Sequence, residues 1–159
     1  MRLYTIGKET ELYIKRYSEL FSYGLLLMTL LLYPKLSIFI LLSPLLFVSL
    51  RWRDPWIITF LLIPLLIPLG FSSRELLKLT FSAFSEELFF RAYLMQRFSN
   101  LWTSFMFALA HLALYKNPSS LLTFFPSLVF GYAYAKTQSL WLVSFLHLLS
   151  NVFYWRFLV

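Results

Sequence analysis

Long apolar runs, interrupted by short groups of prolines and charged residues, occupy most of this sequence. Hydrophobic residues make up 60% of its 159 positions and charged residues only 13%, whereas about a quarter of a soluble domain is charged. That leaves too little polar surface to cover a water-soluble globule, while a lipid bilayer accepts apolar surface. We therefore expect an all-α, polytopic transmembrane helical bundle of six or seven spans, an integral multi-pass protein surrounded by the lipid bilayer.

Prolines and polar groups set the expected boundaries of the segments. The chain is expected to be a single membrane-embedded domain (1–159), with an amphipathic, interfacial N-terminus at 1–20 and catalytic core helices at 82–157. Asp54 is expected to cap a helix that has Pro55 at its first position, and Ser139 to cap the last helix. The expected helical segments are 21–33, 36–50 (ending at the polar group 51–54), 55–69 (kinked at Pro64 and Pro68), 82–97, 101–115, 119–135 and 139–157, with an interfacial stretch at 70–78.

Charge and cysteine usage exclude several classes of function. The net charge of +7 comes from basic residues scattered singly between apolar runs, which is typical of positive residues flanking membrane segments. Nucleic acid needs a continuous basic face, so no nucleic-acid partner is expected. The absence of cysteine excludes disulfides, thiolate nucleophiles and Cys-ligated zinc.

A few polar residues lie inside the apolar segments, where an ionisable side chain costs at least about 2.5 kcal/mol at the bilayer centre. Both of the chain's 2 histidines are among them. Such residues mark functional sites unless they are paired. The set consists of Glu86, Glu87 and Arg91 in 82–97, His111 in 101–115, and His147 and Asn151 in 139–157.

Spacing separates the expected roles of these residues. Glu87 and Arg91 stand at i and i+4 with the carboxylate first, the favourable order for an ion pair along one helix face. Glu86 faces a different direction and has no cation on its own helix, which makes it a candidate general base. His147 and Asn151 share one helix face and offer an imidazole and an amide donor.

If successive helices alternate in direction, these residues lie at one depth in the membrane. The start of 82–97 is then on the same side of the membrane as the ends of 101–115 and 139–157. Each feature alone has a plain structural explanation, since paired charges and interhelical hydrogen bonds are common in membrane bundles. Together, Glu86, His111 and the pair His147 and Asn151 indicate a catalytic site, and we expect them to line one cavity.

The same residues resemble the motifs of a protease family. EELFFR at 86–91 resembles the EExxxR motif of the type II CAAX prenyl endopeptidases, a family (also called Abi) that includes bacteriocin-processing proteins. FALAH at 107–111 and HLLSN at 147–151 resemble its FxxxH and HxxxN motifs. The stretch 131–141 is similar to the turn before the third motif, with Gln138 where the family often has glycine. The resemblance covers residues 82–151.

The resemblance implies a glutamate-dependent intramembrane protease that cleaves a membrane-anchored or lipid-modified protein or peptide and needs no metal or cofactor. It implies that Glu86 and His111 activate water and that His147 and Asn151 stabilise the oxyanion. Glu87 and Arg91 then support the site. The small size favours a prokaryotic cell-membrane protein, and the motifs do not select its substrate or oligomeric state.

Other functions stay open at this point. Two His and two Glu residues can ligate zinc, so a zinc-dependent membrane protease is the nearest enzymatic alternative, although no HExxH stands on one helix. A non-catalytic membrane scaffold or bacteriocin-immunity protein can retain the same fold. A transporter fits less well, because there is one polar cluster and no repeat of helices.

Overall fold

The protein is helical throughout its described length. The structure, a computed structural model, describes residues 3–46, 48 and 54–157, with side chains from residue 17 onward. Within these ranges there is no strand, which confirms the expected all-α class. In the same ranges, no helix combines the length and the apolar character that crossing a membrane requires.

The N-terminal third contains one long helix followed by short ones. α1 (Leu3–Leu32) continues through the expected boundary at residue 20, because no proline precedes Pro34 in the sequence. The N-terminus expected to be a separate segment is therefore joined to the first apolar run, and the side chains of residues 1–16 lie outside the described residues.

Proline also divides the second expected segment. In place of one helix over 36–50, the chain forms η1 (Pro34–Leu36), α2 (Ser37–Leu42) and η2 (Ser43–Leu46). Pro44 lacks a backbone N–H and cannot continue the hydrogen bonding of α2. The expected end of this segment and the polar residues 51–53 lie outside the described residues.

The third segment begins and ends where the sequence predicts. The Asp54 carboxylate accepts a hydrogen bond from the Trp56 backbone N–H at 3.0 Å, and Pro55 opens the 3₁₀ helix η3 (Pro55–Leu69). Gly70 ends η3 in the left-handed region, at φ 93°, a conformation that glycine adopts without steric penalty.

The next helix starts earlier than expected. Ser72 and Glu75 form a capping box at the start of α3 (Ser73–Glu87). The Ser72 hydroxyl and backbone N–H both donate to the Glu75 carboxylate, which holds the pKa of Glu75 below its usual range. No proline or glycine interrupts 73–87. The helix start expected at residue 82 is therefore wrong, and most of the stretch 70–78 belongs to α3.

The C-terminal half follows the prediction closely. The Ser139 hydroxyl accepts from the Leu142 backbone N–H at 3.1 Å, as expected of the residue before the last helix. Gln138 closes the preceding helix in the left-handed region, at φ 53°, which explains why glycine suits this turn. The elements are η4 (Leu88–Tyr93), a π-helical turn, then η5 (Leu94–Gln96), α4 (Asn100–Tyr115), η6 (Pro118–Thr123), α5 (Phe124–Thr137) and α6 (Leu140–Phe157).

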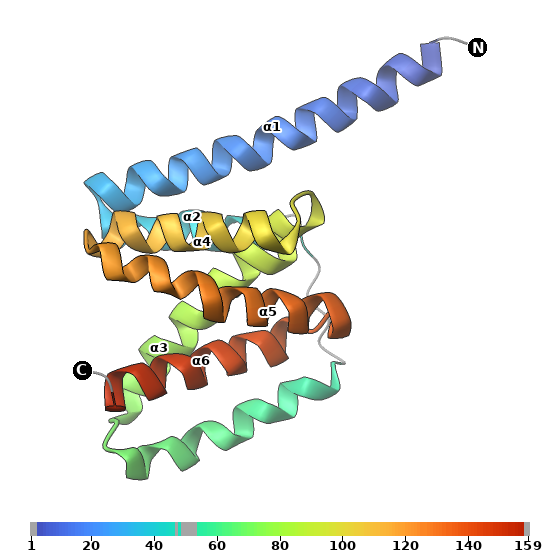
Figure 1. The fold of residues 1–159 in the computed structure, drawn as a ribbon. Coiled ribbons are helices and arrows are strands. Elements are labelled where there is room, and N and C mark those ends of the chain that lie inside the picture. Colours follow the sequence, from blue (N-terminus) through green and yellow to red (C-terminus); the bar gives the residue numbers. More distant parts are fainter. Residues whose placement is uncertain (1–2, 47, 49–53, 158–159) are drawn as a thin grey trace.

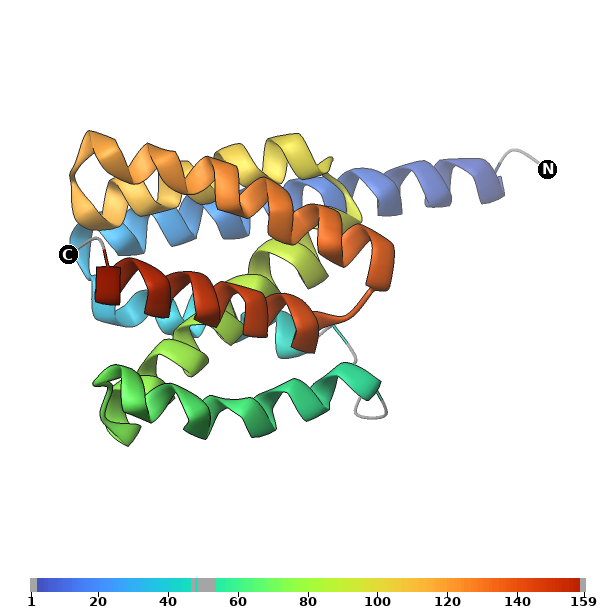
Figure 2. The ribbon, with the colours of Figure 1, turned by 60° about the horizontal axis from the view of Figure 1, so that its bottom comes forward.

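The helices form rows that one helix crosses. α1, α4, α5, α6 and η3 lie in successive rows, and α3 with its π-helical continuation runs obliquely behind them (Figures 1 and 2). α3 packs most extensively against α6. Its far end, where the polar residues of the 86–91 motif stand, is thereby carried into the interior of the bundle.

Gly131 allows α4 and α5 to approach closely. A Cβ atom on Gly131 would overlap the Asn100 side chain. That side chain is fixed in place: Asn100 Nδ2 donates to the Leu128 carbonyl at 2.9 Å, and Asn100 Oδ1 accepts from the Ser104 hydroxyl at 3.2 Å. A side chain at position 131 would therefore displace the start of α4.

We expect Gly131→Ala to lower the free energy of unfolding by about 1–3 kcal/mol, the range for overpacking a filled site. Gly24→Ala is the matched control, because a Cβ there meets nothing within 4 Å and alanine favours a helix over glycine by up to about 1 kcal/mol. Thermal unfolding of the purified protein in detergent measures both. Equal losses in the two variants would contradict the close approach.

Candidate active site

The polar residues of the three motifs meet where α3 ends. Glu86 and Glu87 are the last residues of α3, and Arg91 follows in η4. A helix beginning at residue 82 would place Glu86 near its start. In the structure, Glu86 lies at the end of its helix. It still meets α4 and α6, because α3 crosses them obliquely (Figure 1). His111 and His147 come from those two helices.

The Glu86 carboxylate lies between a hydroxyl and two imidazoles. Ser82 Oγ donates to Glu86 Oε1 at 2.7 Å. The other oxygen, Oε2, is 3.7 Å from His111 Nε2 and 3.9 Å from His147 Nε2. Oε2 is buried and has no hydrogen-bond partner among the described residues. The fold thus brings together three of the four residues expected to be catalytic and leaves one carboxylate oxygen unbound.

The orientation of His111 is fixed by its own helix. Its Nδ1 is 3.1 Å from the Phe107 carbonyl oxygen, and a carbonyl only accepts, so Nδ1–H is the donor. In the neutral ring, Nε2 then carries a lone pair that faces Glu86 Oε2. Neither atom carries a hydrogen to donate to the other. At 3.7 Å they also lie beyond hydrogen-bond distance, which ends near about 3.2 Å. A molecule that donates twice, such as water, satisfies both.

His147 is held by a chain of buried charges. Its Nδ1 is 2.9 Å from Glu87 Oε1, and Glu87 Oε2 accepts from Arg91 Nε at 2.9 Å. Arg91 Nη2 donates to the Ser127 carbonyl at 3.0 Å and to its hydroxyl at 2.5 Å. Glu87 and Arg91 are both 0% exposed. The expected pairing of Glu87 with Arg91 is confirmed, and it also orients His147 toward Glu86.

Aromatic rings position both imidazoles. The Phe107 ring stacks on His111 with centroids 4.3 Å apart, since the two residues stand at i and i+4 on one helix face. The same ring meets His147 edge-on at 5.7 Å. Phe130 stacks on the His147 ring at 5.2 Å. The rings therefore have little freedom to turn away from Glu86.

Sequence reasoning missed three contacts of the site. Ser82 stands four residues before Glu86, and that spacing alone would have predicted its hydrogen bond. Ser127 and Phe130 reach the site from α5. No local pattern announces them, because their contacts depend on how α5 packs.

A cavity of about 180 Å³ opens beside Glu86 and His111. Its lining includes Glu86 and His111, two of the four residues expected to line one cavity, and does not include His147 or Asn151. His147 is bound to Glu87 through Nδ1, and its Nε2 lies 3.9 Å from Glu86 Oε2. Asn151 lies one helical turn beyond His147, is half-buried, and makes no side-chain hydrogen bond with the described residues.

The described residues contain no group of three or more His, Cys, Asp or Glu side chains placed to hold a metal ion.

We expect Arg91→Met to lower the free energy of unfolding by about 3–5 kcal/mol, because it leaves the Glu87 carboxylate buried without a cation. The double variant Glu87→Gln/Arg91→Met leaves no charge at either position and retains an acceptor for His147, so it should be more stable than the single variant. Thermal unfolding in detergent compares the two. A double variant that is no more stable than Arg91→Met would refute this explanation.

Comparison with known protein families gives a match over the region that contains the site. The family model for the type II CAAX prenyl endopeptidase Rce1-like proteins matches residues 68–153, more than half of the chain. The matched range contains Glu86, His111, His147 and Asn151 and leaves out α1 and α2. No curated protein and no solved structure matches the chain.

Proposed function

Because the chain belongs to the Rce1-like type II CAAX prenyl endopeptidase family, we propose that it is a glutamate-dependent intramembrane endopeptidase. Its substrate is a membrane-anchored or lipid-modified protein. One observation carries the proposal: the unbound oxygen Glu86 Oε2 faces the Nε2 atoms of both histidines at 3.7 and 3.9 Å. This is the arrangement that activating a water molecule requires.

In the proposed reaction, a water donates one hydrogen bond to Glu86 Oε2 and another to His111 Nε2. Glu86 takes a proton from the water as the water oxygen attacks the carbonyl carbon of the peptide bond. The tetrahedral intermediate then collapses, the C–N bond breaks, and Glu86 returns the proton to the leaving amine. Ser82 supports this role because its bond to Oε1 keeps the other oxygen directed at the water.

His147 and Asn151 are the proposed donors to the oxyanion. His147 Nδ1 already donates to Glu87, so a protonated ring presents Nε2–H to the developing negative charge. The Asn151 amide comes from the same helix one turn later and is not engaged by the described residues. In a site shielded from water, such donors stabilise the transition state more strongly than in solution.

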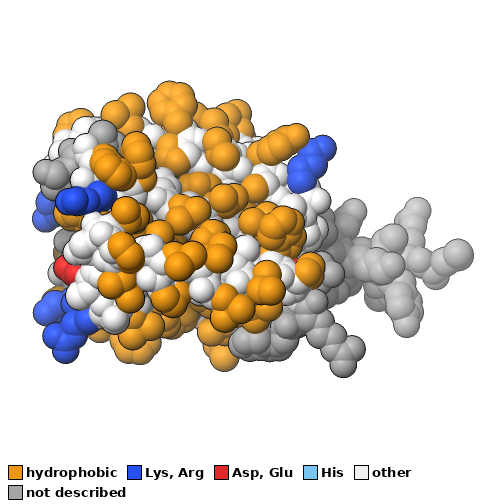
Figure 3. All heavy atoms as spheres, turned by 90° about the horizontal axis from the view of Figure 1, so that it is seen from below, with side chains coloured by type: hydrophobic (Ala, Val, Ile, Leu, Met, Phe, Trp, Pro, Cys, Tyr) orange, Lys and Arg blue, Asp and Glu red, His pale blue; other side chains and the backbone are white. Residues whose placement is uncertain are grey.

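We further propose that the enzyme works within a lipid bilayer, since its family is membrane-associated. Hydrophobic side chains cover most of the face in Figure 3, with Lys and Arg side chains at its edges. α1, α4 and α6 end, and α3 begins, at one end of the bundle (Figures 1 and 2). Exposed cations lie near this end, as in proteins that meet both lipid and headgroups. The exposed cations at this end are Lys35, Arg74, Lys78, Lys116 and Arg156, and those at the opposite end include Arg97 and Lys136.

We expect Glu86→Gln to abolish cleavage of membrane-anchored peptides in reconstituted vesicles, because an amide cannot accept the proton of water. Glu75→Gln is the matched control on the same helix: glutamine serves in a capping box as glutamate does, so its activity should equal that of the wild type. Thermal unfolding should show both variants folded.

Two results would favour the alternative functions. Equal cleavage by wild type and Glu86→Gln, or equal protection of cells by both, would favour a scaffold or immunity protein. Loss of activity on chelation with recovery on adding zinc would favour the zinc-dependent protease.

We expect Asn151→Ala and Asn151→Asp to lower kcat by about 10²- to 10³-fold, the range for losing one oxyanion donor. KM should change little, because the donor acts on charge that develops only in the transition state. An ionised aspartate matches asparagine in shape but donates no hydrogen bond. Steady-state kinetics with unchanged kcat in both variants would remove Asn151 from the mechanism.

A further inference from the structure

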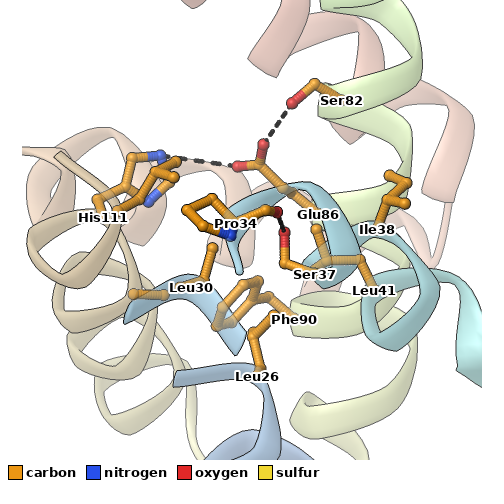
Figure 4. A pocket seen from close by; sticks show the side chains of 12 residues that line it. Leu26, Leu30, Pro34, Ser37, Ile38, Leu41, Ser82, Glu86, Phe90 and His111 are labelled. Atoms are coloured by element: carbon orange, nitrogen blue, oxygen red, sulfur yellow. Dashed lines mark hydrogen bonds and ion pairs between the residues drawn. The ribbon is translucent and has the colours of Figure 1, made fainter. Parts of the chain in front are cut away.

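The cavity beside Glu86 has two kinds of wall. Glu86 and His111 form its polar side, and the Glu86 carboxylate points between Ser82 and His111 above Pro34 (Figure 4). The remaining wall is almost entirely apolar, and the hydroxyl of Ser37 is satisfied by the Pro34 carbonyl at 2.6 Å. The residues of this wall are Leu26, Leu30, Pro34, Ile38, Leu41 and Phe90, with Ala110 and Leu114.

The apolar wall comes largely from outside the family match. Leu26 and Leu30 belong to α1, and Ile38 belongs to α2, whereas the family model begins at residue 68. The residues proposed to perform hydrolysis lie inside the matched range. The chemistry and the shape of the cavity are therefore supplied by different parts of the chain.

The volume of the cavity limits what can occupy it. At about 180 Å³, it lies well below the about 300–1,000 Å³ of pockets for drug-sized ligands. An apolar cavity of about 150 Å³ holds one benzene molecule. A leucine or phenylalanine side chain therefore fits beside Glu86.

We propose that this cavity is the specificity pocket for one apolar side chain of the residue flanking the scissile peptide bond, of leucine to phenylalanine size, and that α1 and α2 set this limit. The inference rests on the proposed function, since it places the peptide bond at Glu86 and His111. Burying the side chain in the apolar wall removes it from water and holds the adjoining carbonyl carbon near the water that Glu86 activates.

Cleavage of vesicle-anchored peptides that carry alanine, leucine or phenylalanine at each flanking position in turn tests the pocket. At one of the two positions, we expect kcat/KM for leucine and phenylalanine to exceed that for alanine by about 10-fold or more. Ile38→Trp fills the pocket and should remove this preference. Leu36→Trp is the matched control, because Leu36 is 49% exposed and is not part of the lining.

Ile38→Ala provides the opposite change and should extend cleavage to peptides with tryptophan at that position. Thermal unfolding checks that each variant folds. If Ile38→Trp does not fold, the Ile38→Ala variant decides the question. Cleavage by the wild type without a size preference, or a preference that all pocket variants retain, would overturn the inference and leave the proposed function intact.

Binding of fluorobenzene, followed by ¹⁹F NMR, tests the pocket without any cleavage. The wild type and Leu36→Trp should bind it, and Ile38→Trp should not. If no peptide is cleaved, the proposed function fails, and this measurement alone decides whether the cavity accepts a single apolar group. Absence of binding to the wild type, or equal binding by Ile38→Trp, would overturn the inference.

Discussion

The buried ion pair between Glu87 and Arg91 determines how the rest of the site is arranged. Two charges that are 0% exposed persist in an apolar interior only when they are paired and hydrogen-bonded. Both members of the pair also bond to another helix: Glu87 bonds His147 on α6, and Arg91 Nη2 bonds Ser127 on α5. Satisfying the pair therefore docks two helices against the end of α3 and leaves the neighbouring Glu86 beside both imidazoles.

Most of the helix boundaries were predictable because local chemistry sets them. Asp54 before Pro55, and Ser139 before the last helix, act through hydrogen bonds within a few residues. The start of α3 was predicted wrongly because charged residues in 70–78 indicated a separate interfacial stretch. In the structure, the capping box at Ser72 begins the helix, which then runs without a break to Glu87. The division of 36–50 into short helices follows from Pro44, whose effect the apolar pattern concealed.

The site was predictable as far as spacing within one helix determines contact. The bond from Arg91 to Glu87 and the stacking of Phe107 on His111 both follow from i, i+4 geometry. Contacts between helices depend on rotation and crossing angle, which the sequence does not state. For that reason the reach of Phe130 from α5 and the separation of His147 from the cavity emerged only in the structure.

In the proposed reaction, Glu86 acts as a base on water and forms no bond to the substrate. A single turnover in H₂¹⁸O, with protein in excess over a cleavable membrane-anchored peptide, distinguishes these two roles by mass spectrometry. We expect one ¹⁸O atom in the new C-terminal carboxylate of the product and none in the Glu86 side chain. Label in Glu86 together with an unlabelled product would show a covalent intermediate on that carboxylate and would refute the role of Glu86 as a base.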